Sequence, residues 1–228
     1  QAGIAHDQES STVWDEAVDA VKRPERAAWV DDNLGSWMHT YFEHDGAYVL
    51  DTRDQPVFAF ENGTMVERRN YENIAVAAKP LVDALRRKLR NSETDELNDH
   101  VLSLGAADVS VVEGHPAVIS VKPIISDTGN IEQAPGSEYL HIAVRFLDGG
   151  FLSDLGQDYL FDALRFSWDA DLRAGETATP LLSASGDPVG YFIWQPYRPG
   201  TVVRAAMTPT LAGVLLVAGL SLAWLIWH

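Results

Sequence analysis

The 228-residue sequence contains no cysteine and has few basic residues. Without cysteine there can be no disulfide framework, no thiol catalysis and no cysteine-based zinc or iron–sulfur site. Lysine and arginine together number 17 against 33 aspartate and glutamate residues, which gives a formal net charge of −16. Such an acidic chain repels phosphate, which argues against a nucleic-acid partner and against peripheral binding to anionic lipid.

Motifs for catalysis and for phosphate or metal binding are also missing. The sequence has no nucleophile elbow, P-loop, HExxH or EF-hand loop. His39, His44 and Asp45 come nearest to a catalytic or metal-binding set, but two histidines five residues apart diverge on a helix, whereas a zinc pair is spaced by three or four. We therefore predict no catalytic residue, no metal and no cofactor in this chain, and expect the histidines to form hydrogen bonds or to lie at a helix end.

Charge is absent from the C-terminal segment between Arg204 and His228. A helix needs roughly 20 apolar residues to span the hydrocarbon core of a membrane, and this segment supplies them. Trp224 and Trp227 suit the membrane interface. A helix buried in a protein core is the alternative, although soluble helices are rarely apolar all round for this length. We predict one domain over residues 1–200 and a transmembrane helix over residues 201–228.

Upstream of this span, helical and strand-like patterns alternate. Helices are predicted over residues 11–21, 24–42, 71–90, 96–104 and 151–160. Strands are predicted over residues 47–51, 56–60, 108–112, 117–125, 139–147, 163–168, 180–185 and 189–195. Several of these strands form hairpins, and the parallel βαβ alternation of dinucleotide-binding folds is missing. The pattern predicts an α+β fold around a mainly antiparallel sheet.

Four short motifs in the first quarter of the chain carry a family resemblance. They are W-D-E-A at 14–17, W-V-D-D-N-L-G at 29–35, D-G-A-Y-V-L-D at 45–51 and P-V-F-A at 56–59. Their order and spacing resemble the fourth CHASE family, a group of mostly bacterial extracytoplasmic sensor domains. The specific match covers residues 7–63, and beyond it the match is one of architecture. The resemblance implies a structural role for the motif residues Trp14, Asp15, Trp29, Asp31, Asn33 and Asp51.

The resemblance also implies a fold, a location and an output. Such domains are similar to PAS or Cache sensors, with long N-terminal helices against an antiparallel sheet and a pocket on one face. They usually lie in the periplasm between two spans of the inner membrane. Apart from the resemblance, we expect a homodimer, because helices that enter from a membrane usually pair. The second span leads to cytoplasmic GGDEF and EAL domains, which make or degrade cyclic di-GMP, or alternatively to a histidine kinase. The signal, a small molecule or a protein, is unknown.

Aromatic and polar side chains mark candidate ligand contacts, because a pocket needs rigid apolar walls and a few polar tips. Strand alternation places Tyr139, His141 and Arg145 on one face, with Leu140 and its neighbours on the core face. Arginine recognises carboxylate or phosphate, which would suit an anionic ligand. For the aromatic residues the alternative role is packing in the protein core. For Tyr139, His141 and Arg145 the alternative is a strand face that is exposed to solvent. The predicted ligand-binding set is Trp37, Tyr41, Tyr48, Tyr139, His141 and Arg145.

Two charged clusters are interpreted as solvated helix faces. One is the acidic N-terminal group, which includes Glu9 and Asp19, and the other is the basic run from Arg86 to Arg90. Two rival functions stay open at this point. The first alternative to a sensor domain is a tail-anchored periplasmic enzyme, which a panel of hydrolase substrates would detect. The second is a module that binds a periplasmic protein, which an apolar surface patch would indicate.

Overall fold

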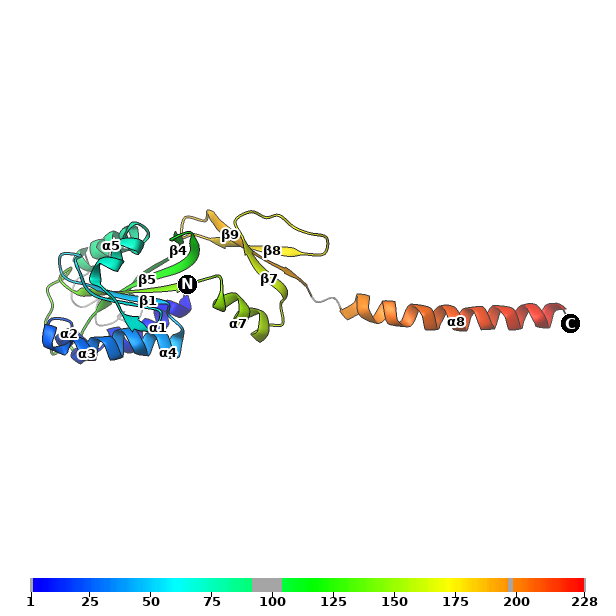
Figure 1. Cartoon of the computed structure of the whole chain (residues 1–228), viewed down its shortest axis with the longest axis horizontal. Helices are drawn as coiled ribbons and strands as arrows, with labels where there is room; N and C mark the ends of the chain where they lie inside the picture. The colour runs from blue at the N-terminus through cyan, green and yellow to red at the C-terminus, as the bar shows by residue number, and fades with distance from the viewer. Residues whose placement is uncertain (1, 92–103, 197–198, 228) are drawn as a thin grey trace.

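The computed structural model describes residues 2–91, 104–196 and 199–227 (Figure 1). Its centre is a six-stranded antiparallel sheet in the order β3-β2-β1-β6-β5-β4. The predicted helix over 96–104 falls almost entirely outside the described residues. The strands of this sheet are β1 (Gly46–Leu50), β2 (Pro56–Glu61), β3 (Thr64–Met65), β4 (Ala106–Val112), β5 (His115–Ile124) and β6 (Tyr139–Phe146).

Tight turns set the register of the predicted hairpins. Glu113 and Gly114, with φ of 49° and 84°, join β4 to β5, and this pair of left-handed residues matches the twist of the two strands. Between β1 and β2 the Asp51 carboxylate accepts the backbone N–H groups of Arg53 (2.8 Å) and Gln55 (2.9 Å). Both predicted hairpins are therefore confirmed.

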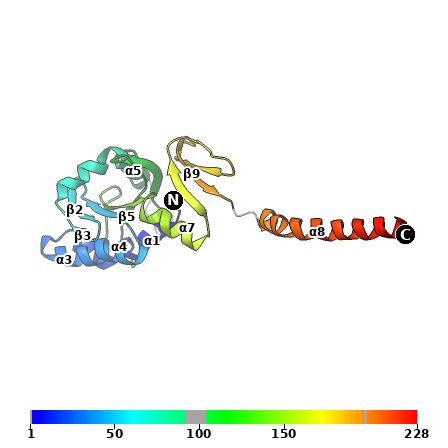
Figure 2. The ribbon, with the colours of Figure 1, turned by 45° about the vertical axis from the view of Figure 1, so that its right-hand side comes forward.

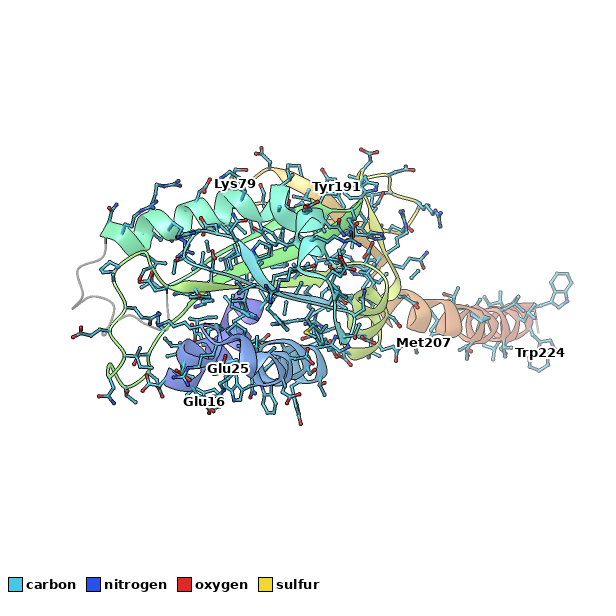
Figure 3. All side chains as sticks on the ribbon, turned by 60° about the vertical axis from the view of Figure 1, so that its left-hand side comes forward. Glu16, Glu25, Lys79, Tyr191, Met207 and Trp224 are labelled. Atoms are coloured by element: carbon cyan, nitrogen blue, oxygen red, sulfur yellow. The ribbon has the colours of Figure 1, made fainter. Side chains whose placement is uncertain are left out.

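Helix α5 (Glu72–Asn91) covers one face of the sheet. One stripe of its apolar residues recurs at the helical period and is buried, whereas Val76 is 88% exposed. Burial of each large aliphatic side chain stabilises this contact by roughly 1.5–3 kcal/mol. Lys79 on the outer side of α5 points away from the sheet (Figure 3). The buried residues of α5 are Ile74, Ala78, Val82, Leu85, Arg86 and Leu89.

The N-terminal helices cover the opposite face (Figure 1). The prediction of one helix from residue 11 to 21 is wrong in its bounds. One helix ends at Thr12 and a second begins at Asp15, because Val13 forms a parallel bridge to Ile125 and Trp14 is extended. Asp15 is in the first turn of the second helix. The elements of this layer are α1 (Ala2–Thr12), α2 (Asp15–Ala20), η1 (Pro24–Arg26), α3 (Ala27–Val30), the π-helical η2 (Asp31–Ser36) and α4 (Trp37–Phe42).

One glycine allows the helical layer to approach the sheet closely. A Cβ atom on Gly35 of η2 would lie 2.6 Å from the Phe60 ring and 3.0 Å from the Phe58 ring. Both phenylalanines are buried in β2. The backbone of η2 at Gly35 therefore packs directly on the phenylalanine rings of β2. Only glycine permits this approach, because it has no Cβ atom.

A second, three-stranded sheet in the order β7-β9-β8 follows. An apolar cluster joins it to the large sheet: Val189 and Phe192 of β9 pack against Val109, Val118 and Leu147. The backbone N–H of Ala184 donates to Asp108 Oδ1 at 2.6 Å across the same boundary. The elements are α7 (Gly150–Asp158), β7 (Asp162–Ser167), β8 (Thr177–Leu182) and β9 (Pro188–Gln195).

The chain closes with helix α8 (Pro199–Trp227), which extends away from both sheets (Figures 1 and 2). It begins at Pro199, two residues before the predicted start of the transmembrane segment at residue 201. Met207–Trp227 has a mean hydropathy of 2.1, and none of its most apolar window is buried. Figure 3 shows Met207 and Trp224 on this isolated helix. The α+β fold with an antiparallel sheet, N-terminal helices and one C-terminal apolar helix is confirmed.

Candidate functional site

A pocket of about 200 Å³ opens between the N-terminal helical layer and the β1–β2 side of the sheet. Its inner wall consists of buried side chains from both layers, which are Val30 of α3, Val49 of β1 and Phe58 of β2. Tyr139 of β6 contributes a half-buried ring. Three exposed cations stand at its mouth, namely Lys22, Arg23 and Arg68.

Pro24 shapes this pocket. Arg23 is extended (φ −118°, ψ 107°), and Pro24 starts η1 directly after it. A residue before proline avoids the helical region, so the chain separates α2 from α3 at this position. The pocket lies at this break between the two helices, and Lys22 and Arg23 are among its lining residues.

Gln8 of α1 and His141 of β6 form a buried polar cluster that joins the N-terminal helical layer to the sheet. His141 is fully buried, its Nε2–H donates to the Leu34 carbonyl at 3.0 Å, and its Nδ1 accepts from Gln8 Nε2 at 2.8 Å. Burial lowers the pKa of His141 to about 4. This imidazole is therefore a neutral structural group between a helix and a strand.

His44 lies in the same layer without such partners. Its side chain is 1% exposed, and neither ring nitrogen makes a hydrogen bond to any described residue. Burial, followed by the charges of His141 and Arg145, lowers the pKa of His44 to about 3. Its Nε2 is 3.7 Å from the Asp7 carboxylate, too far for a hydrogen bond. Since burial keeps His44 neutral, this contact is not a salt bridge.

The predicted ligand-binding residues do not form one site. Tyr48 pairs with Ile142 and so faces α5, on the opposite side of the sheet from His141, and its hydroxyl donates to Glu61 at 2.7 Å. Trp37 and Tyr41 are exposed on α4, with ring centroids 4.1 Å apart. Only Tyr139 lines the pocket.

Arg145, the last member of that set, is engaged within the protein. Its guanidinium forms an ion pair with Glu43 and lies 5.1 Å from the Phe151 ring centroid. The solvent-exposed alternative for the strand face of Tyr139, His141 and Arg145 is wrong, because α1 packs on this face and His141 is fully buried.

The family-motif residues at the N-terminus hold the helical layer in place. Trp14 packs on Trp29 with ring centroids 5.2 Å apart. The Asp15 carboxylate accepts the hydroxyl groups of Ser126 and Thr128, and these hydrogen bonds, Ser126 first, lower the pKa of Asp15. Helix α2 is thereby tied to the loop that follows β5.

Asp31 and Asn33 lie in η2. The Asn33 side-chain amide donates to the Trp29 carbonyl at 2.9 Å, and Asp31 has a buried Oδ1 with no hydrogen bond to the described residues. Burial raises the pKa of Asp31, and the charge of Asp32 adds to this effect. Asp51 shapes the β1–β2 turn, as described above.

Arg86 corrects the interpretation of the basic run as a solvated face. Its side chain is 5% exposed and points into the protein from α5. It donates to the Asp54 carboxylate (2.9 Å) and to the carbonyls of Asp51 (2.8 Å) and Glu138 (2.6 Å). The sequence contained a signal for this burial that was missed. Arg86 follows the buried Val82 by four residues, and residues four apart lie on the same face of a helix.

The interpretation of the acidic N-terminal group as a solvated helix face is wrong for Glu9. It pairs with Lys122 at 2.7 Å, and the two side chains are 10% and 5% exposed. Lys122 belongs to β5, so this pair fastens α1 to the sheet. The described part of the chain contains no group of three or more histidine and carboxylate side chains able to hold a metal ion.

The chain combines a helix-covered antiparallel sheet, a pocket between the layers and a helix long and apolar enough to cross a membrane, as expected of a membrane-anchored sensor domain. The family comparison identifies it: the CHASE4 domain model matches residues 1–167, so the chain belongs to the CHASE4 family. It is the periplasmic sensor domain of a membrane receptor.

The other comparisons add little to the family assignment. No curated protein matches the chain. Among solved structures it is similar to the crystal structure of the Vibrio cholerae LuxQ periplasmic domain, with 12% sequence identity and a TM-score of 0.46. That alignment covers 87% of this chain and 92% of the other.

Proposed function

We propose that this domain, residues 1–200, senses a periplasmic signal and regulates cyclic di-GMP turnover on the cytoplasmic side of the inner membrane through the span within 201–228. The receptor would act as a homodimer with GGDEF and EAL output. The supporting observation is the continuity from β9 to α8. β9 is the central strand of the small sheet, ends at Gln195, and is followed by α8 from Pro199.

The packing around β9 supports this route. Phe192 and Val189 join the small sheet to the large one, so a displacement in the large sheet is transmitted to β9 through close-packed side chains. β9 ends at Gln195 and α8 begins at Pro199, so a displacement of β9 acts on the helix that follows it closely in the chain (Figure 2). A signal that favours one arrangement of the sheets then biases the position of α8.

The test uses the receptor that carries this chain, expressed in cells in which cyclic di-GMP is quantified. One variant replaces residues 195–200 with a flexible glycine-serine segment of the same length, and another deletes residues 1–194. A matched control places the same segment at 168–173, a wholly exposed stretch. We expect the linker variant to give the messenger level of the deletion, and the control to give that of the wild type.

Two results would contradict the proposal. A linker variant indistinguishable from the wild type would show that the signal does not pass through this connection. A deletion of residues 1–194 that leaves cyclic di-GMP unchanged would exclude this messenger as the regulated output. Phosphotransfer measured on the same variants would then test the histidine-kinase alternative.

A further inference from the structure

The pocket between α2, α3 and the sheet has an apolar interior. Val30, Val49 and Phe58 are each at most 5% exposed, and they come from three different elements that pack as one cluster. The walls are therefore held by the core and keep their shape. A pocket of about 200 Å³ with such walls accepts a compact apolar group.

The mouth of the pocket has the opposite electrostatic character to the rest of the chain. The protein has a net charge of −16, yet the lining residues include Lys22, Arg23 and Arg68 and no acidic side chain. Arg23 pairs with Asp19 at 2.7 Å. Lys22 and Arg68 have no salt bridge with any residue that the structure describes, so two cations at the mouth are uncompensated.

These features together define a ligand class. We propose that the pocket binds a small amphiphilic carboxylate, whose apolar body lies against Val30, Val49 and Phe58 and whose carboxylate meets Lys22 and Arg68. The inference rests on the proposed sensory function and names the chemistry of its signal. The apolar walls contribute affinity by burial, and the cations select a negative head group over a neutral one.

The experiment measures binding by calorimetry to the full chain in lipid nanodiscs, with empty nanodiscs as the reference. The probes are phenylacetate, benzoate and hexanoate, together with phenylacetamide as the neutral counterpart of the first. We expect a carboxylate to bind with a Kd in the millimolar range or tighter, as suits so few heavy atoms. The amide should bind more weakly than its acid, by at least about tenfold for the loss of a charge-assisted contact.

Paired variants locate the site. Lys22→Gln and Arg68→Gln should each weaken phenylacetate binding by roughly three- to tenfold, because these cations are exposed and partly screened by solvent. Arg87→Gln removes the same charge from the exposed side of α5, across the sheet, and should change nothing. Ala27→Phe fills the pocket and should abolish binding, whereas Ala28→Phe, on the same exposed surface but outside the lining, should not.

Three results would overturn the assignment: no binding by any of the three carboxylates at millimolar concentration, equal binding of phenylacetamide and phenylacetate, or equal losses in Arg87→Gln and Lys22→Gln. None of these depends on an output domain. A failure here therefore leaves the signalling proposal intact, and a failure of the linker experiment leaves carboxylate binding intact.

Discussion

Buried neutral histidines should make the stability of this domain fall steeply in mild acid. In the folded protein the pKa is about 3 for His44 and about 4 for His141, whereas that of an ordinary histidine is 6.5. Below pH 6.5 the unfolded chain takes up a proton at each position while the folded chain stays neutral. The free energy of unfolding therefore decreases as the pH drops from 6.5 toward 4.

The magnitude follows from linkage. Each histidine contributes a slope of about 1.4 kcal/mol per pH unit in this window, which amounts to about 2 kcal/mol between pH 7.5 and pH 5. Carboxyl groups with raised pKa values, such as those of Asp7 and Asp45, act in the opposite sense. The comparison of single variants with the wild type isolates the histidine contribution from theirs.

The assay is urea denaturation of the full chain in nanodiscs at pH 7.5 and pH 5, followed by tryptophan fluorescence. His44→Leu and His141→Leu should each reduce the pH-dependent loss by about 2 kcal/mol. They should differ at pH 7.5. His44→Leu should be neutral or stabilising, because no described residue bonds its ring. His141→Leu should cost about 1–3 kcal/mol, because it removes the buried hydrogen bonds that the ring makes with Gln8 and with the Leu34 carbonyl.

The control is His6→Gln, whose wild-type side chain is 85% exposed. The reasoning is refuted if His44→Leu loses as much stability between the two pH values as the wild type does. It is also refuted if His44→Leu and His141→Leu are equally destabilising at pH 7.5, since their different hydrogen bonding would then have no effect.

Two further changes test the packing. Arg86→Met should lower the free energy of unfolding by about 3–5 kcal/mol, because it removes charge-assisted hydrogen bonds to the Asp54 carboxylate and to the Asp51 and Glu138 carbonyls. Arg87→Met is the exposed control, and an equal cost for both variants would contradict this explanation. Gly35→Ala should lower the same quantity by about 1–3 kcal/mol despite the higher helix propensity of alanine, because its Cβ meets Phe60. In a double-mutant cycle Phe60→Leu should reduce that cost, and additive effects would show that the ring contact is not responsible.

Local patterns in the sequence were enough for the elements and the family. Alternation, turn residues and the helical period predicted most of the described strands and helices within a few residues, since these features depend on near neighbours along the chain, whereas most of α1 and the short β3 were missed. The charge-free run after Arg204 predicted α8 for the same reason. The motifs between Trp14 and Ala59 predicted the family that the domain comparison shows.

The ligand-contact residues could not be predicted in this way, because their neighbours are distant in sequence. Tyr48 and His141 are both polar residues on adjacent strands, but the antiparallel register puts them on opposite faces. Arg86 resembles Arg87 in the sequence, yet Arg86 is buried against the β1–β2 turn and the loop before β6, whereas Arg87 is exposed.

The pocket was likewise decided only in three dimensions. Its walls come from α3, β1, β2 and β6, and its cations lie 46 positions apart at Lys22 and Arg68. Nothing local distinguishes these two cations from other surface charges. Composition and periodicity determine which segments are helical, which are extended and which enter a membrane. Which side chains share a cavity depends on how the layers pack, because packing brings together residues that no short stretch of sequence contains.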